Sequence, residues 1–553
     1  MKTDLLIKNA NVLTLDSQNS RAGSIAVTNG KISGIWLEAD PPKHKINTTA
    51  NTEVVDLNKY TIIPGFIETH NHILMYSQLR THVDCSTPPN ESISDIVKAI
   101  GNKAMEVEPG EWIEGFGYDD TLLYEKRHPT RYDLDKVSPN NPVIIKHISW
   151  HFAVANSIAL QMAGLNDKMS DPKGGHLGRD ERGRLNGVLF ELSAINLVTE
   201  HIPKKTIKDL VKSLGKASND YVAQGITTNT DAGIGFNGGI EEYQIHIEAA
   251  EKRLNPMRSQ LMIMHHFLRE GEVFGNYTAK QLDDEIKQRT NGLAKLDSAK
   301  FFQDGSIQGL TGALRKPYYK FPNVTGELIH KQIPFTEEIV DLHKRGFRIA
   351  THGNGDRAIE SILDAYKEAL EKYPRTNHRH RIEHVQTATF NDLINMRTLG
   401  VAGSFFVNHV YYWGDRHENV FLGPERARRI SPLADAIKNH LLFTLHSDCP
   451  VTPISPLFSV WAAVNRITRE GKVLGADQRI NVETALKAMT INGATLNFDE
   501  KRSGSIELGK NADFAILEVD PTTIDPIEIK DIKVVATFIG GRTVYGGEKL
   551  KTY

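Results

Sequence analysis

The amino-acid sequence predicts an α/β protein in which a (β/α)8 TIM-type barrel is inserted into a small β-sandwich domain. Three observations lead to this prediction. Both chain ends are rich in short β segments. Between them, an amphipathic helix, a glycine and a short apolar strand recur as a unit, which indicates a parallel sheet. Such units extend over about 420 residues and no Gly-x-Gly-x-x-Gly turn follows a strand, so a closed barrel with insertions is favoured over an open doubly wound sheet.

The small β-sandwich is expected to comprise residues 1–60 and 497–553. Its N-terminal part contains the segments LLIKNANVLTL, SIAVTNGKISGIWL and EVVDL, and Asn29-Gly30 is typical of a β-hairpin turn. The C-terminal part has the same character, with DFAILEVD, VVATFIGG and RTVYGG. One small sheet domain built from both ends is the simplest assembly.

The barrel is expected to comprise residues 61–496. In TIKDLVKSLGKASNDYVAQ, apolar residues recur at steps of three and four, and Gly225 then ends the helix before the strand ITTNTD. The same unit recurs in EEIVDLHKR with FRIATH, in NDLINMRTL with VAGSFF, and in SPLADAIKNH with LLFTLHSD. A stretch rich in glycine and charge around residues 165–195 predicts an inserted loop or hairpin.

Composition excludes several classes of protein. The 553 residues contain 66 Lys and Arg against 68 Asp and Glu, a balance that argues against a nucleic-acid-binding arm or a membrane-binding face. Two cysteines, Cys85 and Cys449, cannot build a disulfide framework or a zinc-finger array. The N-terminus lacks the apolar core of a signal peptide, and no run of 18 apolar residues occurs. We therefore expect a soluble, cytoplasmic protein.

Polar residues cluster at the C-terminal ends of the predicted strands, the rim on which the active sites of such barrels form. They are His70, His72, Lys300, Asp304, His352, His384, His446 and Asp448. With 22 histidines, about one His-x-His pair arises by chance, so the spacing alone is weak evidence. His70 and His72 end an apolar run, where a period of two places both side chains on one face. The other pair, His378 and His380, precedes its strand among Arg and Asn.

Four of these histidines, with one aspartate and one lysine, predict a metal centre: His70, His72, His352, His384, Asp448 and Lys300. Neutral imidazole and carboxylate suit Zn, Fe, Ni or Mn, and the chain offers no thiolate pair. A bound cation lowers the pKa of water to about 7. Asp448 is then expected to accept a proton from that water and pass it to a leaving group. Packed or solvated histidines and a salt-bridged Lys300 are the structural alternatives.

The segments that carry these residues resemble the amidohydrolase superfamily, and within it amidohydrolase family 3, with its YtcJ-like and N-substituted formamide deformylase-like members. The resemblance covers nearly the whole chain in order. It rests on PGFIETHNH, SWHFAVANSIAL, AKFFQDGSIQGLTGAL, ATHGNGDRAI, RIEHVQ, HSDCPV and GSIELGKNADFAILEVD. These motifs are specific for fold and metal chemistry and poorly specific for substrate.

The resemblance implies one or two divalent metals, zinc first among them, at the top of the barrel. His70 and His72 would bind one metal with Asp448 nearby, and His352 and His384 the second. Lys300 would be carbamylated and bridge the two, because a carbamate presents two anionic oxygens. The chain departs from the family pattern at Glu68, where Asp is commoner. It also departs at His446, which is either an extra hydrogen-bonding residue or a packed histidine.

Further residues are candidates for substrate contact. His151 follows an apolar strand and is expected to polarise the substrate carbonyl or stabilise the oxyanion, with a structural histidine as the equal alternative. Asp304 is a candidate substrate-binding residue beside Lys300. Several aromatic residues are expected to line a pocket, although packing is the commoner role of such a cluster. They are Trp150, His409, Tyr411, Tyr412 and Trp413.

The leading hypothesis is a metal-dependent hydrolase of a non-peptide C–N bond, in an amide or an N-acyl or N-formyl amine. An ester, lactone or cyclic-amide hydrolase on the same site is the first alternative, and a catalytically silent regulatory or binding protein of the same fold is the second. Deamination of a nucleobase is disfavoured, since the deaminases of this superfamily carry a Glu after the fifth-strand His and lack the lysine. The expected partner is a small-molecule substrate, with no nucleic acid or membrane, and the resemblance leaves a homo-oligomer open.

Overall fold

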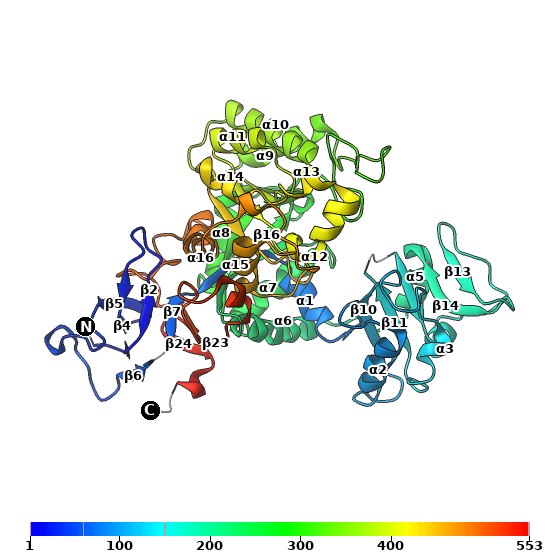
Figure 1. The fold of residues 1–553 in the computed structure, drawn as a ribbon, viewed down its shortest axis with the longest axis horizontal. Helices are drawn as coiled ribbons and strands as arrows, with labels where there is room; N and C mark the ends of the chain where they lie inside the picture. The colour runs from blue at the N-terminus through cyan, green and yellow to red at the C-terminus, as the bar shows by residue number, and fades with distance from the viewer. Residues whose placement is uncertain (1, 59, 149–150, 551–553) are drawn as a thin grey trace. The chain divides into compact units, whose positions relative to one another are not determined.

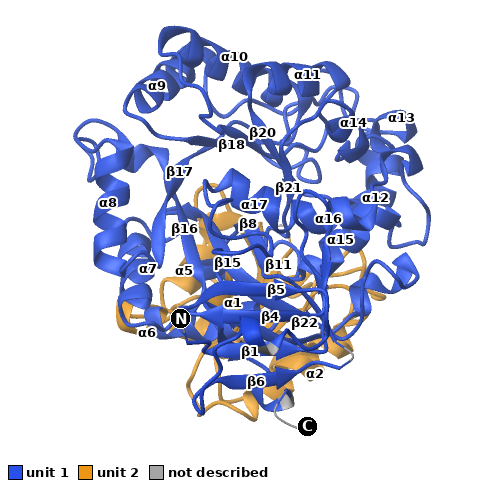
Figure 2. Ribbon diagram, turned by 90° about the vertical axis from the view of Figure 1, so that its left-hand side faces the viewer, with its two compact units in different colours: residues 1–75, 211–553 blue, residues 76–210 orange. Residues whose placement is uncertain are grey.

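The computed structural model describes residues 2–58, 60–148 and 151–550. The chain forms two compact units: unit 1 comprises residues 1–75 and 211–553, and unit 2 comprises residues 76–210 (Figure 2). Unit 1 holds an eight-stranded parallel sheet and the sheets built by the chain ends. The predicted fold class is therefore confirmed.

The eight strands of the barrel follow one another in sheet order as they do along the chain, and every neighbouring pair is parallel. Thr69 of the first strand and Thr444 of the last lie side by side, with their hydroxyl oxygens 2.9 Å apart. Figure 2 shows the strands inside a ring of helices. The strands are β8 (Phe66–Asn71), β15 (Ile226–Ile234), β16 (Arg258–Met264), β17 (Ala294–Phe302), β18 (Ile349–Gly353), β19 (Arg381–His384), β20 (Ala402–Phe405) and β21 (Phe443–Leu445).

The helices of the recurring unit form where the apolar periodicity places them. Helix α6 (Ile207–Val222) buries Val211, Leu214 and Tyr221 on one face, and Gly225 beyond it has a φ of +80°. A glycine adopts this left-handed conformation without the steric cost of a Cβ atom. The other helices of unit 1 are α7 (Glu241–Glu251), α8 (Ala279–Thr290), α9 (Gln332–Lys344), α10 (Asp356–Lys372), α11 (Phe390–Leu399), α12 (His409–Arg416), α13 (Pro424–Ala427), α14 (Leu433–Lys438), α15 (Pro456–Asn465), α16 (Val482–Ala488) and α17 (Ile491–Leu496).

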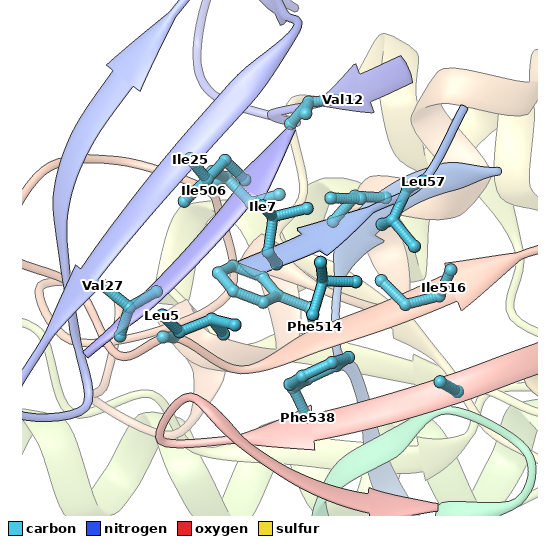
Figure 3. Packing of buried hydrophobic residues seen from close by; sticks show 14 of the residues in the cluster. Leu5, Ile7, Val12, Ile25, Val27, Leu57, Ile506, Phe514, Ile516 and Phe538 are labelled. Carbon is cyan, nitrogen blue, oxygen red and sulfur yellow. The ribbon is translucent and has the colours of Figure 1, made fainter. Parts of the chain in front are cut away.

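The two chain ends meet in the smaller sheets. The C-terminal strand β22 (Phe514–Leu517) pairs antiparallel with β7 (Thr61–Pro64), which joins a six-stranded sheet in the order β24-β23-β22-β7-β2-β3 (Figure 1). A second sheet has the order β5-β4-β1-β6, and apolar residues of both sheets share one core (Figure 3). The remaining strands are β1 (Leu5–Lys8), β2 (Asn11–Leu13), β3 (Arg21–Ala22), β4 (Ser24–Thr28), β5 (Lys31–Trp36), β6 (Glu53–Asp56), β23 (Val534–Ile539) and β24 (Arg542–Tyr545).

The turn predicted at Asn29-Gly30 joins β4 and β5, which pair antiparallel. Both residues have a positive φ, 52° and 71°. Two consecutive positive φ values are what a two-residue type I′ hairpin turn requires.

Unit 2 lies between β8 and β15 in the sequence and has its own six-stranded sheet, in the order β13-β14-β12-β11-β10-β9. The glycine-rich stretch near residues 165–195 contains the antiparallel hairpin of β13 and β14. The unit is therefore larger than the loop region expected there, while the predicted domain boundaries stay a prediction. Its elements are α1 (Ile73–Leu79, shared with unit 1), β9 (Val83–Asp84), α2 (Ile93–Ala104), β10 (Ile113–Tyr118), α3 (Arg131–Leu134), β11 (Val143–His147), β12 (Phe152–Ala155), α4 (Ser157–Met162), β13 (His176–Arg179), β14 (Leu185–Phe190) and α5 (Glu191–Thr199).

The histidine pair that precedes β19 forms a buried hydrogen-bond chain. His378 Nε2 donates to the Leu399 carbonyl at 2.8 Å, and its Nδ1 accepts from the His380 backbone N–H at 2.9 Å. His380 Nδ1 accepts from the Ile349 backbone N–H, and its Nε2 lies 2.8 Å from His343 Nδ1. These contacts require neutral imidazoles, because each ring both donates and accepts. The pair is structural, as its sequence context indicates.

We expect stability to fall as the pH drops below 6.5. Burial lowers the pKa of His378 to about 4 and that of His380 well below its ordinary value. In this window the unfolded chain binds a proton that the folded protein excludes. Each such histidine therefore removes about 1.4 kcal/mol of unfolding free energy per pH unit until its folded-state pKa is reached. Thermal unfolding between pH 7.5 and 4.5 measures the slope, and His378→Asn should flatten it. An equal slope in the variant would contradict the assignment.

Candidate metal centre

All six predicted metal ligands belong to unit 1 and lie at the C-terminal ends of barrel strands. His70 is in β8 and His72 directly follows it, Lys300 is in β17, His352 in β18 and His384 in β19, and Asp448 lies three residues after β21. His384 and Asp448 have φ values of +72° and +54°. Left-handed backbone at non-glycine residues is costly and clusters at functional sites.

His70, His72 and Asp448 converge on one point. Nε2 of His70 and Nε2 of His72 each lie 3.3 Å from Oδ1 of Asp448. The intervening Asn71 points to the other side, where its amide donates to Asn229 and its oxygen accepts from Tyr221. His70 and His72 therefore lie on one face of the strand, as the period of two predicts.

This group fits a metal cation. Oδ1 of Asp448 is buried and has no hydrogen-bond partner among the described residues, although two imidazole nitrogens lie close by. Ligand atoms bound about 2.0–2.2 Å from a tetrahedral zinc lie about 3.3–3.6 Å apart, which matches the two spacings. The three side chains offer the nitrogen and oxygen donors that a divalent transition metal prefers.

Lys300 is fully buried and its Nζ has no hydrogen-bond partner within the described part of the chain. Burial lowers the pKa of its ammonium to about 8, against the opposing charges of Glu383 and Asp448. Nζ lies 4.7 Å from the centre of the Phe302 ring. A buried amine with a depressed pKa and no hydrogen-bond partner among the described residues differs from an ordinary salt-bridge lysine.

His352 and His384 lie next to each other, with ring centres 4.4 Å apart. Nε2 of His352 is 3.2 Å from the Gly305 carbonyl and 2.9 Å from the Asn354 amide nitrogen, so this nitrogen is engaged by the protein. Burial and the Lys300 charge lower the pKa of His352 to about 3. The ring is therefore neutral and its Nδ1 is the nitrogen available to a ligand.

His446 connects two of the candidate ligands. Its ring stacks on His70 with centres 4.7 Å apart, and its Nε2 lies 3.1 Å from Nδ1 of His384. Its Nδ1 lies 2.9 Å from the Ser404 hydroxyl. A ligand role for His384 through Nε2 requires its Nδ1–H to donate to His446. His446, for which the sequence left two roles open, therefore forms hydrogen bonds at this site.

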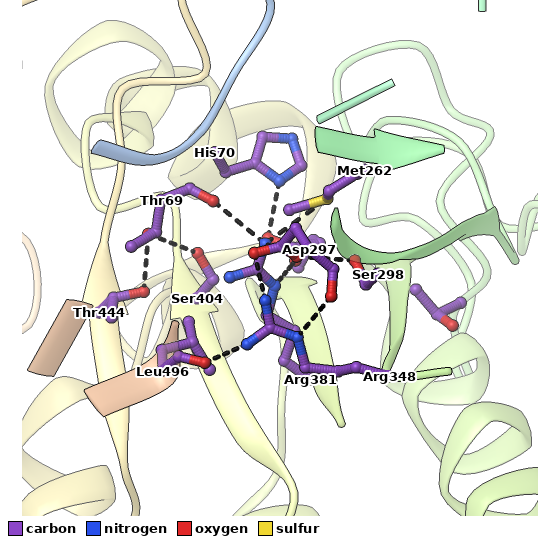
Figure 4. A network of polar contacts seen from close by, with 12 residues as sticks. Thr69, His70, Met262, Asp297, Ser298, Arg348, Arg381, Ser404, Thr444 and Leu496 are labelled. Carbon is purple, nitrogen blue, oxygen red and sulfur yellow. Dashed lines mark hydrogen bonds and ion pairs between the residues drawn. The ribbon is translucent and has the colours of Figure 1, made fainter. Parts of the chain in front are cut away.

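A chain of buried charged groups lies beneath His70 (Figure 4). Nδ1 of His70 lies 2.7 Å from Oε2 of Glu383, and Arg381, Asp297 and Arg348 continue the chain. On the other side of the pair, Nδ1 of His72 is 4.0 Å from Asp231, which His246 contacts at 3.1 Å.

Glu68 joins the first strand to the loop that carries Asp448. Its carboxylate accepts from the Ser447 hydroxyl at 2.9 Å and from the Ser447 backbone N–H at 3.3 Å. Burial raises its pKa to about 8. The unusual glutamate therefore holds the Asp448 loop against β8 instead of joining the ligand set.

The remaining predicted residues lie in several environments. Asp304 is fully buried and accepts from the backbone N–H groups of Ala313, Asn354 and Gly355, and burial raises its pKa to about 7. It therefore organises the loops around His352. His409 is buried against His417 and packs on Trp413, with ring centres 4.4 Å apart.

The other predicted residues are His151, Trp150 and two tyrosines. His151 belongs to unit 2, where its Nδ1 lies 2.8 Å from Glu191. Trp150 lies outside the described residues. Tyr411 and Tyr412, also expected in an aromatic pocket, pack on Phe458.

Sequence reasoning missed Glu383, Asp231 and Asn354. One signal could have indicated Glu383, since RIEH places two charged residues two positions apart in a strand of a buried barrel. Asp231 and Asn354 carry no such signal, because neither stands in a recognisable pattern with the histidine that it contacts.

A cavity of about 810 Å³ adjoins the centre at Gly305, whose carbonyl contacts His352. Its walls come from the loop after β17 and from residues 323–329. They include Leu310, Thr311, Val324, Leu328 and Ile329. The wall therefore combines apolar side chains with the hydroxyls of Thr311 and Thr325, the amide of Asn323 and the carboxylate of Glu327.

A second group of possible ligands, Asp119, Asp120 and His147, lies in unit 2. Oδ1 of Asp119 already accepts from the backbone N–H and hydroxyl of Thr121, and His147 Nε2 lies 3.1 Å from Asp120. Contacts within the protein already engage these side chains, and we assign no cation to the group.

An eight-stranded parallel barrel with histidines and a carboxylate converging at its C-terminal rim defines the class of metal-dependent hydrolases. The family model of the amidohydrolase family matches residues 53–545. The chain belongs to the amidohydrolase family.

Relatives and solved structures agree with this assignment. The chain is 30% identical to the N-substituted formamide deformylase of Arthrobacter pascens, over 97% of each chain. It is 26% identical to the putative amidohydrolase YtcJ of Bacillus subtilis strain 168, over 97% of this chain and 98% of that protein. An uncharacterized metal-dependent hydrolase from Pyrococcus horikoshii OT3 has a TM-score of 0.74 at 22% identity, covering 94% of this chain and 99% of that one. No helix in the described ranges is long and apolar enough to cross a membrane.

Proposed function

We propose that the protein hydrolyses a non-peptide C–N bond, in an amide or in an N-acyl or N-formyl amine. The observation that carries the proposal is the convergence of His70, His72 and Asp448 beside the buried, unpaired amine of Lys300. The name of the 30% identical relative, an N-substituted formamide deformylase, supports a C–N bond as the target.

The residues that would hold metal are His70, His72 and Asp448 at one position, and His352 and His384 at the other, with a carbamylated Lys300 between them. We propose zinc, because the donors are imidazole nitrogens and carboxylate oxygens without thiolates. The bound cation supplies Lewis acidity and makes water nucleophilic at neutral pH.

Asp448 is the proposed proton carrier. Burial would raise the pKa of its carboxyl, but contacts with His70 and His72 hold that pKa well below its ordinary value. The group is therefore ionised at neutral pH. It would take a proton from the attacking water and return it to the departing nitrogen. His151, which follows an apolar strand in the sequence, stays a prediction for the partner of the carbonyl oxygen.

The cavity at Gly305 is the proposed binding pocket for the substrate's organic substituent. The apolar side chains of its wall favour a small molecule with a hydrocarbon part, and Asn323 and Glu327 offer polar groups. We also propose a cytoplasmic location, since Cys85 and Cys449 are both buried free thiols, which suits a reducing compartment.

Two alternatives predict different results from one experiment. The protein is purified without chelator, its metal content is measured, and a matched panel of N-formyl amines, N-acyl amines, esters, lactones and cyclic amides is assayed. We expect one or two equivalents of divalent metal and the highest kcat/KM on the N-formyl or N-acyl amines. A preference for esters, lactones or cyclic amides would support the alternative hydrolase. Metal-free protein without activity on any substrate would support the regulatory or binding protein.

A further inference from the structure

Four charged side chains form an ionic group, linked in a row, in the barrel interior beneath His70 of the candidate metal centre. Glu383 pairs with Arg381 at 2.5 Å, Arg381 also reaches Asp297 at 3.2 Å, and Asp297 pairs with Arg348. All four are buried. Two carboxylates and two guanidiniums cancel in charge, so the group carries no net charge into the interior.

The upper end of this group contacts a candidate ligand. Oε2 of Glu383 lies 2.7 Å from Nδ1 of His70, a short distance for a nitrogen–oxygen hydrogen bond. An ionised carboxylate can only accept, so Nδ1 of His70 carries the proton. The lone pair of that imidazole is then on Nε2, the atom that lies 3.3 Å from Asp448.

The rest of the group is held in place by other contacts. Arg348 donates to the Leu496 carbonyl and to the Asp297 carbonyl, and Arg381 donates to the Thr69 carbonyl at 3.2 Å (Figure 4). Thr69 directly precedes His70, so Arg381 holds the backbone of β8 while Glu383 holds the His70 ring. Both contacts fix the orientation of the same ligand.

A buried ionic group is a poor source of stability, because the cost of removing charges from water offsets their attraction. A purely structural group could lie anywhere in the core, whereas this one ends on a candidate ligand. We propose that Glu383 is a positioning residue: it fixes the tautomer and ring orientation of His70, so that Nε2 is presented to the metal. This inference rests on the metal centre of the proposed function.

Metal affinity tests the inference without any substrate. Zinc dissociation constants are measured by competition with a chromophoric chelator for the wild type and for Glu383→Gln, which keeps the side-chain volume. We expect the affinity of the site that contains His70 to fall about 10–100-fold, the usual cost of removing the partner of a metal-binding histidine. Wild-type affinity in the variant would overturn the inference.

A double-mutant cycle separates positioning from a general effect on the fold. In a His70→Ala background there is no ring to orient, so adding Glu383→Gln should change zinc affinity no further. An equal loss in that background would overturn the proposal, because Glu383 would then act by another route. Ser298→Ala is the matched control: it removes a hydrogen bond to Oδ1 of Asp297, which contacts Arg381, and should leave zinc affinity unchanged.

If the Glu383→Gln variant fails to fold, Glu383→Asp provides a second test of the same inference. The aspartate retains the charge that Arg381 needs but is one methylene shorter, so its reach to His70 is lost. We expect a folded protein with weakened zinc binding, and unchanged zinc binding would overturn the inference. Failure of the proposed function gives a different result from failure of this inference. If the wild-type protein itself binds no zinc, the proposed metal centre is wrong.

Discussion

Replacing Asp448 by asparagine is expected to lower kcat about 10²–10⁴-fold, the contribution of a positioned acid–base group. The amide cannot take the proton of the attacking water, while its oxygen retains the shape of the carboxylate. The carboxylate is well placed for this role, because its Oδ1 is buried, lies 3.3 Å from both imidazoles and has no hydrogen-bond partner among the residues that the structure describes.

Steady-state kinetics and metal analysis on the same preparation measure this effect. Asp392→Asn is the matched control: Asp392 caps α11 and pairs with Arg315, so its loss should lower the melting temperature and spare kcat. Turnover near the wild-type value in a metal-containing Asp448→Asn protein would refute the proton-carrier role.

Replacing Lys300 by methionine is expected to stabilise the metal-free protein while impairing the enzyme. The ammonium is fully buried without a hydrogen-bond partner within the described ranges, and burial lowers its pKa to about 8. Below pH 8 the lysine is charged in both the folded and the unfolded state. The cost of removing this charge from water therefore lowers the free energy of unfolding in full. Methionine has a similar shape and no charge, and we expect about 1–3 kcal/mol of added stability.

The same substitution removes the group proposed to bridge two metals. We expect bound metal to fall to one equivalent or less and turnover to fall at least about 100-fold, since metal ions supply several kcal/mol of transition-state stabilisation. Thermal unfolding of the metal-free proteins and metal analysis check the two effects. Lys295→Met provides the contrast. Lys295 lies on the same strand as Lys300 but forms an ion pair with Asp499 at 2.6 Å, so its replacement should destabilise the folded protein. A destabilised Lys300→Met protein would show that the lysine is structural.

Much of the fold was predictable because its signals are local. Apolar periodicity and Gly225, Gly346 and Gly400 identify helices that end before strands, and in the structure each of these glycines has a positive φ. The fold of residues 76–210 was not predictable in the same way. Its sheet mixes parallel and antiparallel pairs, so its strands do not repeat the helix–glycine–strand unit.

The candidate site also has features that the sequence predicts and features that it does not. The ligand types and their order were predictable, because the chemistry of a metal centre needs histidine and carboxylate at strand ends. The contacts around them were not. Glu383 reaches His70 across 313 positions of sequence, and Glu68 reaches Ser447 across 379. Pairing over such separations is set by strand register around the barrel, which a single sequence does not display.

By itself the sequence indicated the helix–glycine–strand pattern of the barrel, the β-rich character of both chain ends and the residue types that could bind metal. Only the tertiary structure decided which nitrogen of each histidine is engaged by the protein and that Lys300 has lost its solvent. It also decided that a neutral group of four charges supports His70. The physical reason is that hydrogen-bond direction and desolvation depend on the neighbours of a side chain in space, and the closed barrel supplies those neighbours from remote segments.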